Sequence, residues 1–228
     1  IILSIIFSFT VYSCSSKEES TTATNTTAPV ITEITAVTTP TNDSTPDYTF
    51  SSSTSGTITY GGSCSSSTTS AIIGNNTITL VSLSDGTYSD CTIVVTDSAG
   101  NASNTLTITS FTVDSTVETL TEVTAVTTPT NDSTPDYTFY SSTAGTITYG
   151  GSCSSSTTSA ISGNNTVTLE SLSDGTYSDC TIVVTDSAGN ASNTLTITSF
   201  TVDSTAATLT EVTAVTTPTN DSTPDYTF

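Results

Sequence analysis

A ten-residue stretch, TNDSTPDYTF, occurs three times in the chain, at residues 41–50, 130–139 and 219–228. The copies lie 89 residues apart. A fixed long period is typical of an array of similar folded units, and it constrains the architecture before any shorter motif does. We therefore expect the chain to be part of a longer array, with two complete units and the start of a third at 28–116, 117–205 and 206–228.

The two complete units are almost identical. Residues 34–116 and 123–205 differ only at Ile34/Val123, Ser51/Tyr140, Ser55/Ala144, Ile73/Ser162, Ile78/Val167 and Val81/Glu170. A glutamate at an inward position would bury an unpaired charge, so we expect Val81 and Glu170 to face water. The exchange at Ile73 predicts an outward position for the same reason. The exchanges at Ile34 and Ile78 remove only a methyl group and predict buried positions.

Within one unit, short alternating apolar and polar runs are separated by turn residues. The predicted strands occupy 31–37, 47–53, 56–62, 77–83, 87–96 and 104–113, with a short seventh strand around 66–73. Strands that recur at this spacing in so small a unit predict an all-β fold, a small antiparallel sandwich. Tyr48 and Phe50 alternate on one face and are expected to enter its core.

Two of these strands change phase along their length. Tyr88 lies three residues before Cys91, so the two side chains would point to opposite faces of a regular strand. We expect a bulge near residues 89–90 that lets both pack inward. Phe111 lies out of phase with the apolar residues before it, which predicts a bulge or a switch between sheets near residues 109–110.

The run LSDGTYSDCTIVVTDSAGNASNTLTITSFTVDST, with the Ala28-Pro29 entry and the E-V-T-A-V segment, resembles bacterial immunoglobulin-like (Big-type) repeats of large surface adhesins and biofilm-associated proteins. The resemblance implies tandem immunoglobulin-like sandwiches arranged as a rod. It also implies that the repeats serve as a stalk. The segment at 85–88 resembles the tyrosine corner of immunoglobulin domains, with one more residue between its Tyr and the following Cys.

Apart from Cys14, the cysteines form one pair in each unit, Cys64 with Cys91 and Cys153 with Cys180. Paired cysteines in an exported chain without histidine predict a disulfide within each unit. The alternative is a thiolate metal site, but two sulfurs supply too few ligands. In an immunoglobulin-like layout the third and sixth strands are neighbours, so the bridge is expected within one sheet or at its edge.

The first residues predict export. IILSIIFSFTVYS is a short apolar run that is typical of a signal peptide, at 1–13. Val11-Tyr12-Ser13-Cys14 resembles a bacterial lipobox, so Cys14 is the expected lipidation site and 14–27 a threonine-rich tether. An ordinary secretory signal with an unrelated cysteine is the alternative. We therefore expect an exported protein, lipid-anchored at the outer membrane or cell surface.

The charge of the chain is strongly one-sided. It has 21 acidic residues, one Lys or Arg and no His, which gives a net charge of −20. Nucleic acid is excluded as a partner, because a phosphate-binding surface needs lysine and arginine.

Acidic side chains are expected to meet where one unit follows another. The predicted calcium ligands at this junction are Asp43, Asp47, Asp85, Asp114, Asp186 and Asn190. Calcium is the one cofactor that this pattern of side chains suggests. The alternative is that these residues are turn formers, because Asp and Asn bond their own backbone in turns.

No catalytic residues are predicted. Serine is abundant, but without histidine, and with Lys17 on the tether, no nucleophile has an evident base. We expect a non-enzymatic stalk or adhesin that acts in cell adhesion or biofilm formation. One alternative is a module that binds a surface glycan or protein, with avidity from its copies. Another is a spacer for an enzyme domain encoded beyond residue 228.

Overall fold

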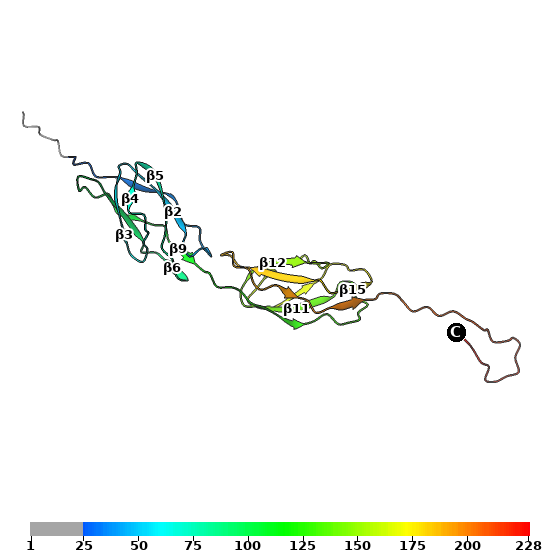
Figure 1. Cartoon of the computed structure of the whole chain (residues 1–228). Coiled ribbons are helices and arrows are strands. Elements are labelled where there is room, and N and C mark those ends of the chain that lie inside the picture. The colour runs from blue at the N-terminus through cyan, green and yellow to red at the C-terminus, as the bar shows by residue number, and fades with distance from the viewer. Residues whose placement is uncertain (1–24) are drawn as a thin grey trace, which may run out of the picture.

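The structure, a computed structural model, describes residues 25–228 and is all-β, without a helix in that range. Two sandwiches follow one another along the chain (Figure 1). Each has its own hydrophobic core, built from residues between 31 and 113 and between 120 and 202. The predicted signal peptide, the lipidation site Cys14 and most of the tether lie outside the described residues.

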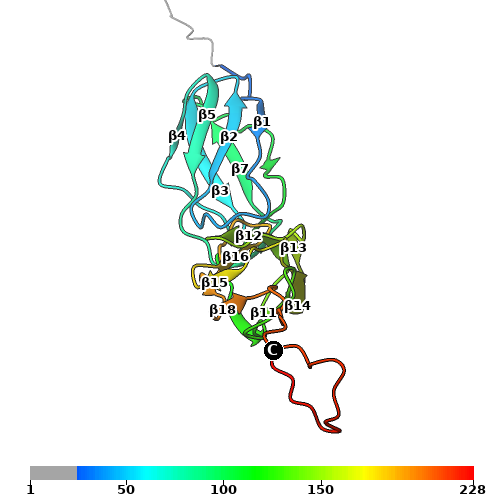
Figure 2. The ribbon, with the colours of Figure 1, turned by 90° about the vertical axis from the view of Figure 1, so that its right-hand side faces the viewer.

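The first sandwich consists of short antiparallel strands, and three of them lie side by side in Figure 2. That sheet has the order β1-β2-β5, with β1 Ile31–Thr35, β2 Asp47–Ser52 and β5 Gly74–Thr79. The facing sheet has the order β4-β3-β7-β8, with β3 Gly56–Gly61, β4 Ser70–Ala71, β7 Thr92–Thr96 and β8 Leu106–Thr107. A two-stranded ladder pairs β6 Gly86–Tyr88 with β9 Phe111–Val113. This strand order is that of an immunoglobulin-like sandwich.

The second sandwich repeats these sheets. The first sheet has the order β10-β11-β14, with β10 Leu120–Thr124, β11 Asp136–Ser141 and β14 Gly163–Thr168. The second has the order β13-β12-β16-β17, with β12 Gly145–Gly150, β13 Ser159–Ala160, β16 Thr181–Thr185 and β17 Leu195–Thr196. The remaining ladder pairs β15 Gly175–Tyr177 with β18 Phe200–Val202. The short predicted strand around 66–73 is therefore present in both copies, as β4 and β13.

Alternation along the strands fills the core. Tyr48 and Phe50 on β2 are fully buried, as the sequence predicts. Ile78 is buried as well, while Ile73 and Val81 are 69% and 51% exposed, which confirms all three predictions from the differences between the copies. The prediction for Ile34 is wrong, because this side chain is 51% exposed.

Ile34 is exposed because the inner side of its strand is occupied by the neighbouring Glu33. Ile31 is buried, and a period of two then places Glu33 on the inner side and Ile34 on the outer side. The pairing of β1 with β2 shifts register between Glu33 and Thr35. A β-branched apolar residue on the outside of an edge strand is therefore compatible with the Ile/Val exchange without burial.

Two predicted strands are broken, and the breaks lie opposite each other. The segment 87–96 is divided into β6 and β7, and 104–113 into β8 and β9. The register is unchanged across the gap, because Tyr88 pairs with Phe111 and Thr92 with Thr107. The expected bulge at 89–90 is therefore wrong, because neither strand gains a residue relative to its partner. Both strands change phase together instead, and β8 and β9 belong to different sheets.

The segment after the second sandwich has little structure of its own. In residues 206–228, every side chain except the half-buried Val215 is exposed. One isolated bridge joins Thr213 to Thr227. The pairing partner that β2 finds in β5 has no counterpart in the described part of this copy.

Candidate functional site

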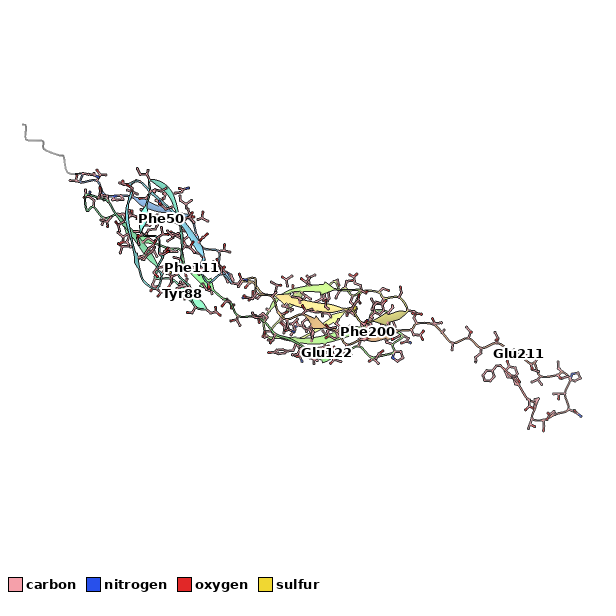
Figure 3. All side chains as sticks on the ribbon, in the orientation of Figure 1. Phe50, Tyr88, Phe111, Glu122, Phe200 and Glu211 are labelled. Carbon is pink, nitrogen blue, oxygen red and sulfur yellow. A yellow bond between two sulfur atoms is a disulfide. The ribbon has the colours of Figure 1, made fainter. Side chains whose placement is uncertain are left out.

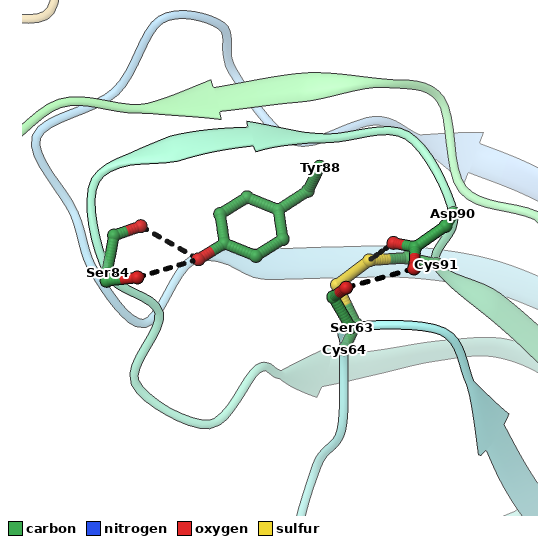
Figure 4. The surroundings of a disulfide bond; sticks show 6 residues. All are labelled: Ser63, Cys64, Ser84, Tyr88, Asp90 and Cys91. Atoms are coloured by element: carbon green, nitrogen blue, oxygen red, sulfur yellow. Dashed lines mark hydrogen bonds between the residues drawn. A yellow bond between two sulfur atoms is a disulfide. The ribbon is translucent and has the colours of Figure 1, made fainter.

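Each sandwich carries one disulfide at the end of its larger sheet. Cys64 follows β3 and Cys91 precedes β7, and these two strands are paired neighbours (Figure 4). The Cα atoms lie 5.2 Å apart in both bridges, Cys64–Cys91 and Cys153–Cys180. The predicted pairing within each unit is confirmed, and each bridge joins the ends of two neighbouring strands at the edge of one sheet. Such bridges are typical of extracytoplasmic proteins.

The tyrosine next to the disulfide forms a tyrosine corner. The hydroxyl of Tyr88 donates to the backbone carbonyl of Ser84 at 2.8 Å (Figure 4), and its ring stacks on Phe111. Tyr177 makes the same bond to Ser173 at 2.9 Å. The extra residue between the tyrosine and the cysteine is accommodated by the interruption at residues 89–90, where the chain changes phase.

The predicted calcium ligands of the first repeat are bonded to nearby donors. Asp43 accepts from the backbone N–H of Thr45 at 2.8 Å, and Asp47 accepts from the hydroxyl of Thr79 at 2.6 Å. Asp85 accepts from Ser115 and Thr116, three bonds that lower the pKa of its carboxyl. Asp114 accepts from the backbone N–H of Thr116 at 3.2 Å.

The loop after β16 holds the other two predicted ligands. Burial opposes ionisation of Asp186, but bonds from Asn190 and the backbone of Ala188 lower the pKa of its carboxyl. Nowhere in residues 25–228 do three or more acidic, histidine or cysteine side chains gather as a metal site. The carboxylates do not gather in threes among these residues, and each is turned toward hydroxyl and amide donors of its own surroundings. Calcium binding at the predicted ligands stays a prediction.

A glutamate that sequence reasoning missed connects the two sheets of each sandwich. Glu33 on β1 accepts from the hydroxyl of Tyr48 at 3.0 Å. It also accepts from the backbone N–H and the hydroxyl of Thr109, at 3.0 Å and 2.7 Å. Thr109 lies in the gap between β8 and β9, where its N–H has left the regular ladder. The carboxylate supplies the acceptor that the interrupted strand lacks.

Two of these three bonds recur in the second sandwich, where the hydroxyl of the buried Tyr137 has no hydrogen-bond partner among the described residues. Glu122 accepts from Thr198, through the backbone at 3.0 Å and the hydroxyl at 2.7 Å. Burial opposes ionisation, but these bonds outweigh it, so the pKa of Glu122 lies below its ordinary value. The signal in the sequence is an acidic residue at an inward position of an otherwise apolar strand face.

The two sandwiches contact each other through two short segments. Asn42, in the turn before β2, donates its backbone N–H to the carbonyl of Ala188 at 3.1 Å and its side-chain amide to the carbonyl of Gly189 at 3.0 Å. In return, Asn190 donates its side-chain amide to the backbone carbonyl of Asp114 at 2.7 Å. Asp114 and Asn190 thus meet at the junction, as expected, but through an amide and a carbonyl.

The described surface has no evident ligand cavity. No pocket opens in residues 25–228. Within the same residues, no helix is long and apolar enough to cross a membrane.

Comparisons with known proteins leave the family open. No protein-family profile matches the chain, and no curated protein matches it by sequence. One similar solved structure is SGBP-B from the mixed-linkage glucan utilization locus of Bacteroides ovatus, in complex with a mixed-linkage heptasaccharide. The identity is 20%, over 80% of this chain and 47% of that protein, with a TM-score of 0.25. The chain spans about half the length of that protein, and so low a TM-score carries no argument about fold or ligand.

Proposed function

We propose that the chain is a non-enzymatic surface protein of a bacterium, in which tandem sandwiches act as a spacer that projects other parts of the protein away from the cell. The observation that carries the proposal is the repetition of a whole disulfide-bonded sandwich, with a direct contact from one copy to the next. Copies joined in this way add length without adding a new chemical group. A rod-like arrangement is part of this proposal.

The site of attachment belongs to the same proposal. Cys14 is the proposed lipidated residue, and 15–27 the tether between the lipid and the first sandwich. A surface made of threonine, serine and acidic side chains suits a module that stays hydrated outside the cell. Adhesion or biofilm formation is the wider role that this design favours.

A surface-display experiment tests the spacer. An epitope is placed after residue 228, and antibody binding to intact cells is compared between the whole chain and a variant without residues 117–205. We expect weaker binding for the shorter chain, because its epitope lies closer to the cell envelope. Equal binding would contradict the spacer. In parallel, Cys14→Ser should release the protein from the membrane fraction, while retention would contradict the lipid anchor.

A second candidate function, binding of a glycan, rests on one exposed aromatic side chain. Tyr140 on the outer face of β11 is 40% exposed, between Thr121 on β10 and Asn164 on β14. The first repeat has Ser51 there, bonded to the hydroxyl of Thr32. A flat aromatic ring flanked by hydroxyl and amide groups is suited to stack on the apolar face of a sugar.

The two repeats provide the matched test for this candidate. Tyr140→Ser converts the second sandwich to the residue that the first already has. We expect it to abolish binding to a panel of neutral oligosaccharides that includes a mixed-linkage heptasaccharide, measured by calorimetry. Unchanged binding would place the glycan site elsewhere on the chain. Absence of binding by the native chain would rule out glycan binding as a function.

A further inference from the structure

The contact between the sandwiches is made by a loop with a defined shape. In the second sandwich, Asp186 accepts from the backbone N–H groups of Ala188 and Asn190 at 2.9 Å and 2.8 Å. The N–H of Gly189 in turn bonds the carbonyl of Asp186. These bonds leave the carbonyls of Ala188 and Gly189 free to accept from Asn42 of the first sandwich.

The loop has the same shape in the first sandwich. There, Asp97 accepts from Ala99 and Asn101 at 2.9 Å and 2.8 Å, and Gly100 bonds the carbonyl of Asp97. The partner on its outer side is Asn25, whose carbonyl accepts from Asn101 at 2.8 Å. Asn25 occupies the position that Asp114 occupies before the second sandwich. The loop therefore forms whether it follows a sandwich or the tether.

The opposing turn is also formed in advance. Thr41 bonds Thr112 and Asp114 through its backbone, which ties the turn to the end of β9. Thr130 makes the equivalent bonds to Thr201 and Asp203, although the described residues hold no folded sandwich after the second one. The turn thus presents Asn131 in the same local frame as Asn42.

Docking covers Ala188 and Asn190 of the loop in the second sandwich, while Gly189 stays exposed. Asn190 is only 7% exposed, whereas its counterpart Asn101 is half-buried. Gly189 has a φ of +96°, and a Cβ atom there would lie 3.4 Å from the amide nitrogen of Asn42. This positive φ favours glycine, while a Cβ atom at that position would make ordinary van der Waals contact with the amide of Asn42.

We propose that the turn at 130–132 is a docking surface, and that its occupant is the Asp-Ser-Ala-Gly-Asn loop of a third sandwich that follows in the same array. Asn131 would donate to the two central carbonyls of that loop, as Asn42 does to Ala188 and Gly189. The inference rests on the proposed spacer function and deepens it. The same two pre-formed segments set the orientation of each unit relative to the next along the array.

Asn42→Asp and Asn131→Asp make the same chemical change in the same ten-residue sequence. The first replaces the amide donor that faces the carbonyl of Gly189 with an acceptor, while the second alters a turn without a docked loop in this chain. We expect ¹⁵N relaxation of the full chain to give shortened tumbling times for both sandwiches in Asn42→Asp. Asn131→Asp should keep the native values. Equal values for Asn42→Asp and the native chain, or equal effects of the two variants, would overturn the proposal.

A second arm tests the docking surface itself. The chain is extended after Phe228 with the sequence 51–114, which completes a third sandwich and supplies the missing loop. Asn131→Asp should now shorten the tumbling times of the second and third sandwiches, and no change would refute the proposed occupant. The results of these relaxation experiments can be told apart from a negative result in the epitope-display test of the spacer. Loss of the contact alone would leave a spacer with freely moving units, whereas equal epitope exposure would refute the spacer and leave the contact intact.

Discussion

At the scale of the residue, one inward-facing carboxylate accepts the hydrogen bonds that the backbone and side chain of an interrupted strand would otherwise leave unpaired. Glu122 lies within the second sandwich, and Glu211, at the same position of the next copy, lies on the exposed segment that follows (Figure 3). The same residue therefore occurs with and without its partners in one chain. The difference between the two positions isolates the contribution of the hydrogen bonds from Thr198.

Glu122→Gln should destabilise the second sandwich by about 1–3 kcal/mol at neutral pH, because the bonds from Thr198 lose their charged acceptor. Glu211→Gln should have little effect. Since the folded-state pKa of Glu122 is lowered, its contribution is complete above the ordinary value of 4.5 and is lost as the pH falls through the lower folded-state value. Calorimetry of both variants between neutral and acidic pH measures this, and a difference that persists at the lowest pH would contradict it.

The tyrosine corner gives a second prediction for a single group. Tyr88→Phe removes the bond from the hydroxyl to the carbonyl of Ser84 and leaves the ring on Phe111. We expect a loss of about 1 kcal/mol in the first sandwich, measured by urea unfolding. Tyr140→Phe is the control, because its hydroxyl belongs to an exposed side chain. A similar loss in both variants would argue against a role for the corner.

At the scale of the element, the hairpin of β6–β7 with β8–β9 lacks continuous pairing along its length. Its ladder is interrupted on both strands, and the disulfide lies beside the interruption, between Cys91 and the end of β3. The bridge closes a loop of 27 residues in the chain. It therefore restricts the unfolded chain where regular backbone pairing is absent in the folded one.

Cys64→Ala combined with Cys91→Ala should lower the stability of the first sandwich by about 3.5 kcal/mol on the chain-entropy estimate. The second sandwich keeps its own bridge and serves as the internal reference in the same calorimetric scan. Mass spectrometry of the native chain without reductant should find each bridge closed within its own unit. Free thiols at these positions, or bridges between units, would contradict the structure.

At the scale of the whole molecule, repulsion between like charges dominates the electrostatics. Lys17 is the one basic side chain of the sequence, and residues 25–228 contain none. Added salt therefore screens repulsion and has no ion pairs to weaken among the described residues. The expected result is that salt stabilises the chain.

The unfolding midpoint should rise as NaCl increases from about 10 mM to about 100 mM, because the Debye length falls from roughly 30 Å to roughly 10 Å. Calorimetry over this range measures the rise, and a fall would contradict the interpretation. Calcium chloride at the same ionic strength should give the same midpoint. A larger rise, lost in Asp43→Asn or Asp186→Asn, would instead support calcium at the predicted ligands.

Much of the fold was predictable because it depends on short-range patterns. Alternation around Tyr48 and Phe50 identified a core strand, and a cysteine pair in each copy identified the bridge. The broken strands were predictable only in part. A change of phase at Tyr88 was visible, but whether it inserts a residue or is matched on the partner strand depends on pairing across the hairpin.

The candidate site was less predictable than the fold. The acidic residues were expected to converge. The turns are rich in threonine and serine, however, and nearby hydroxyl and amide groups donate hydrogen bonds to the carboxylates. Glu33 was overlooked because its partner Thr109 lies 76 residues away in the chain. Asn42, the residue that reaches the next sandwich, has no local feature that separates it from other turn residues.

The sequence by itself determined the repeat, the all-β class, the inward face of the main strands and the cysteine pairs, because each of these depends on spacing along the chain. Only the tertiary structure decided that Glu33 turns inward, that two strands change phase together, and that Asn42 meets the loop of the next sandwich. These features depend on which hydrogen-bond donors and acceptors remain unpaired after the strands have paired. The groups that then bond to each other come from segments that are distant in the chain.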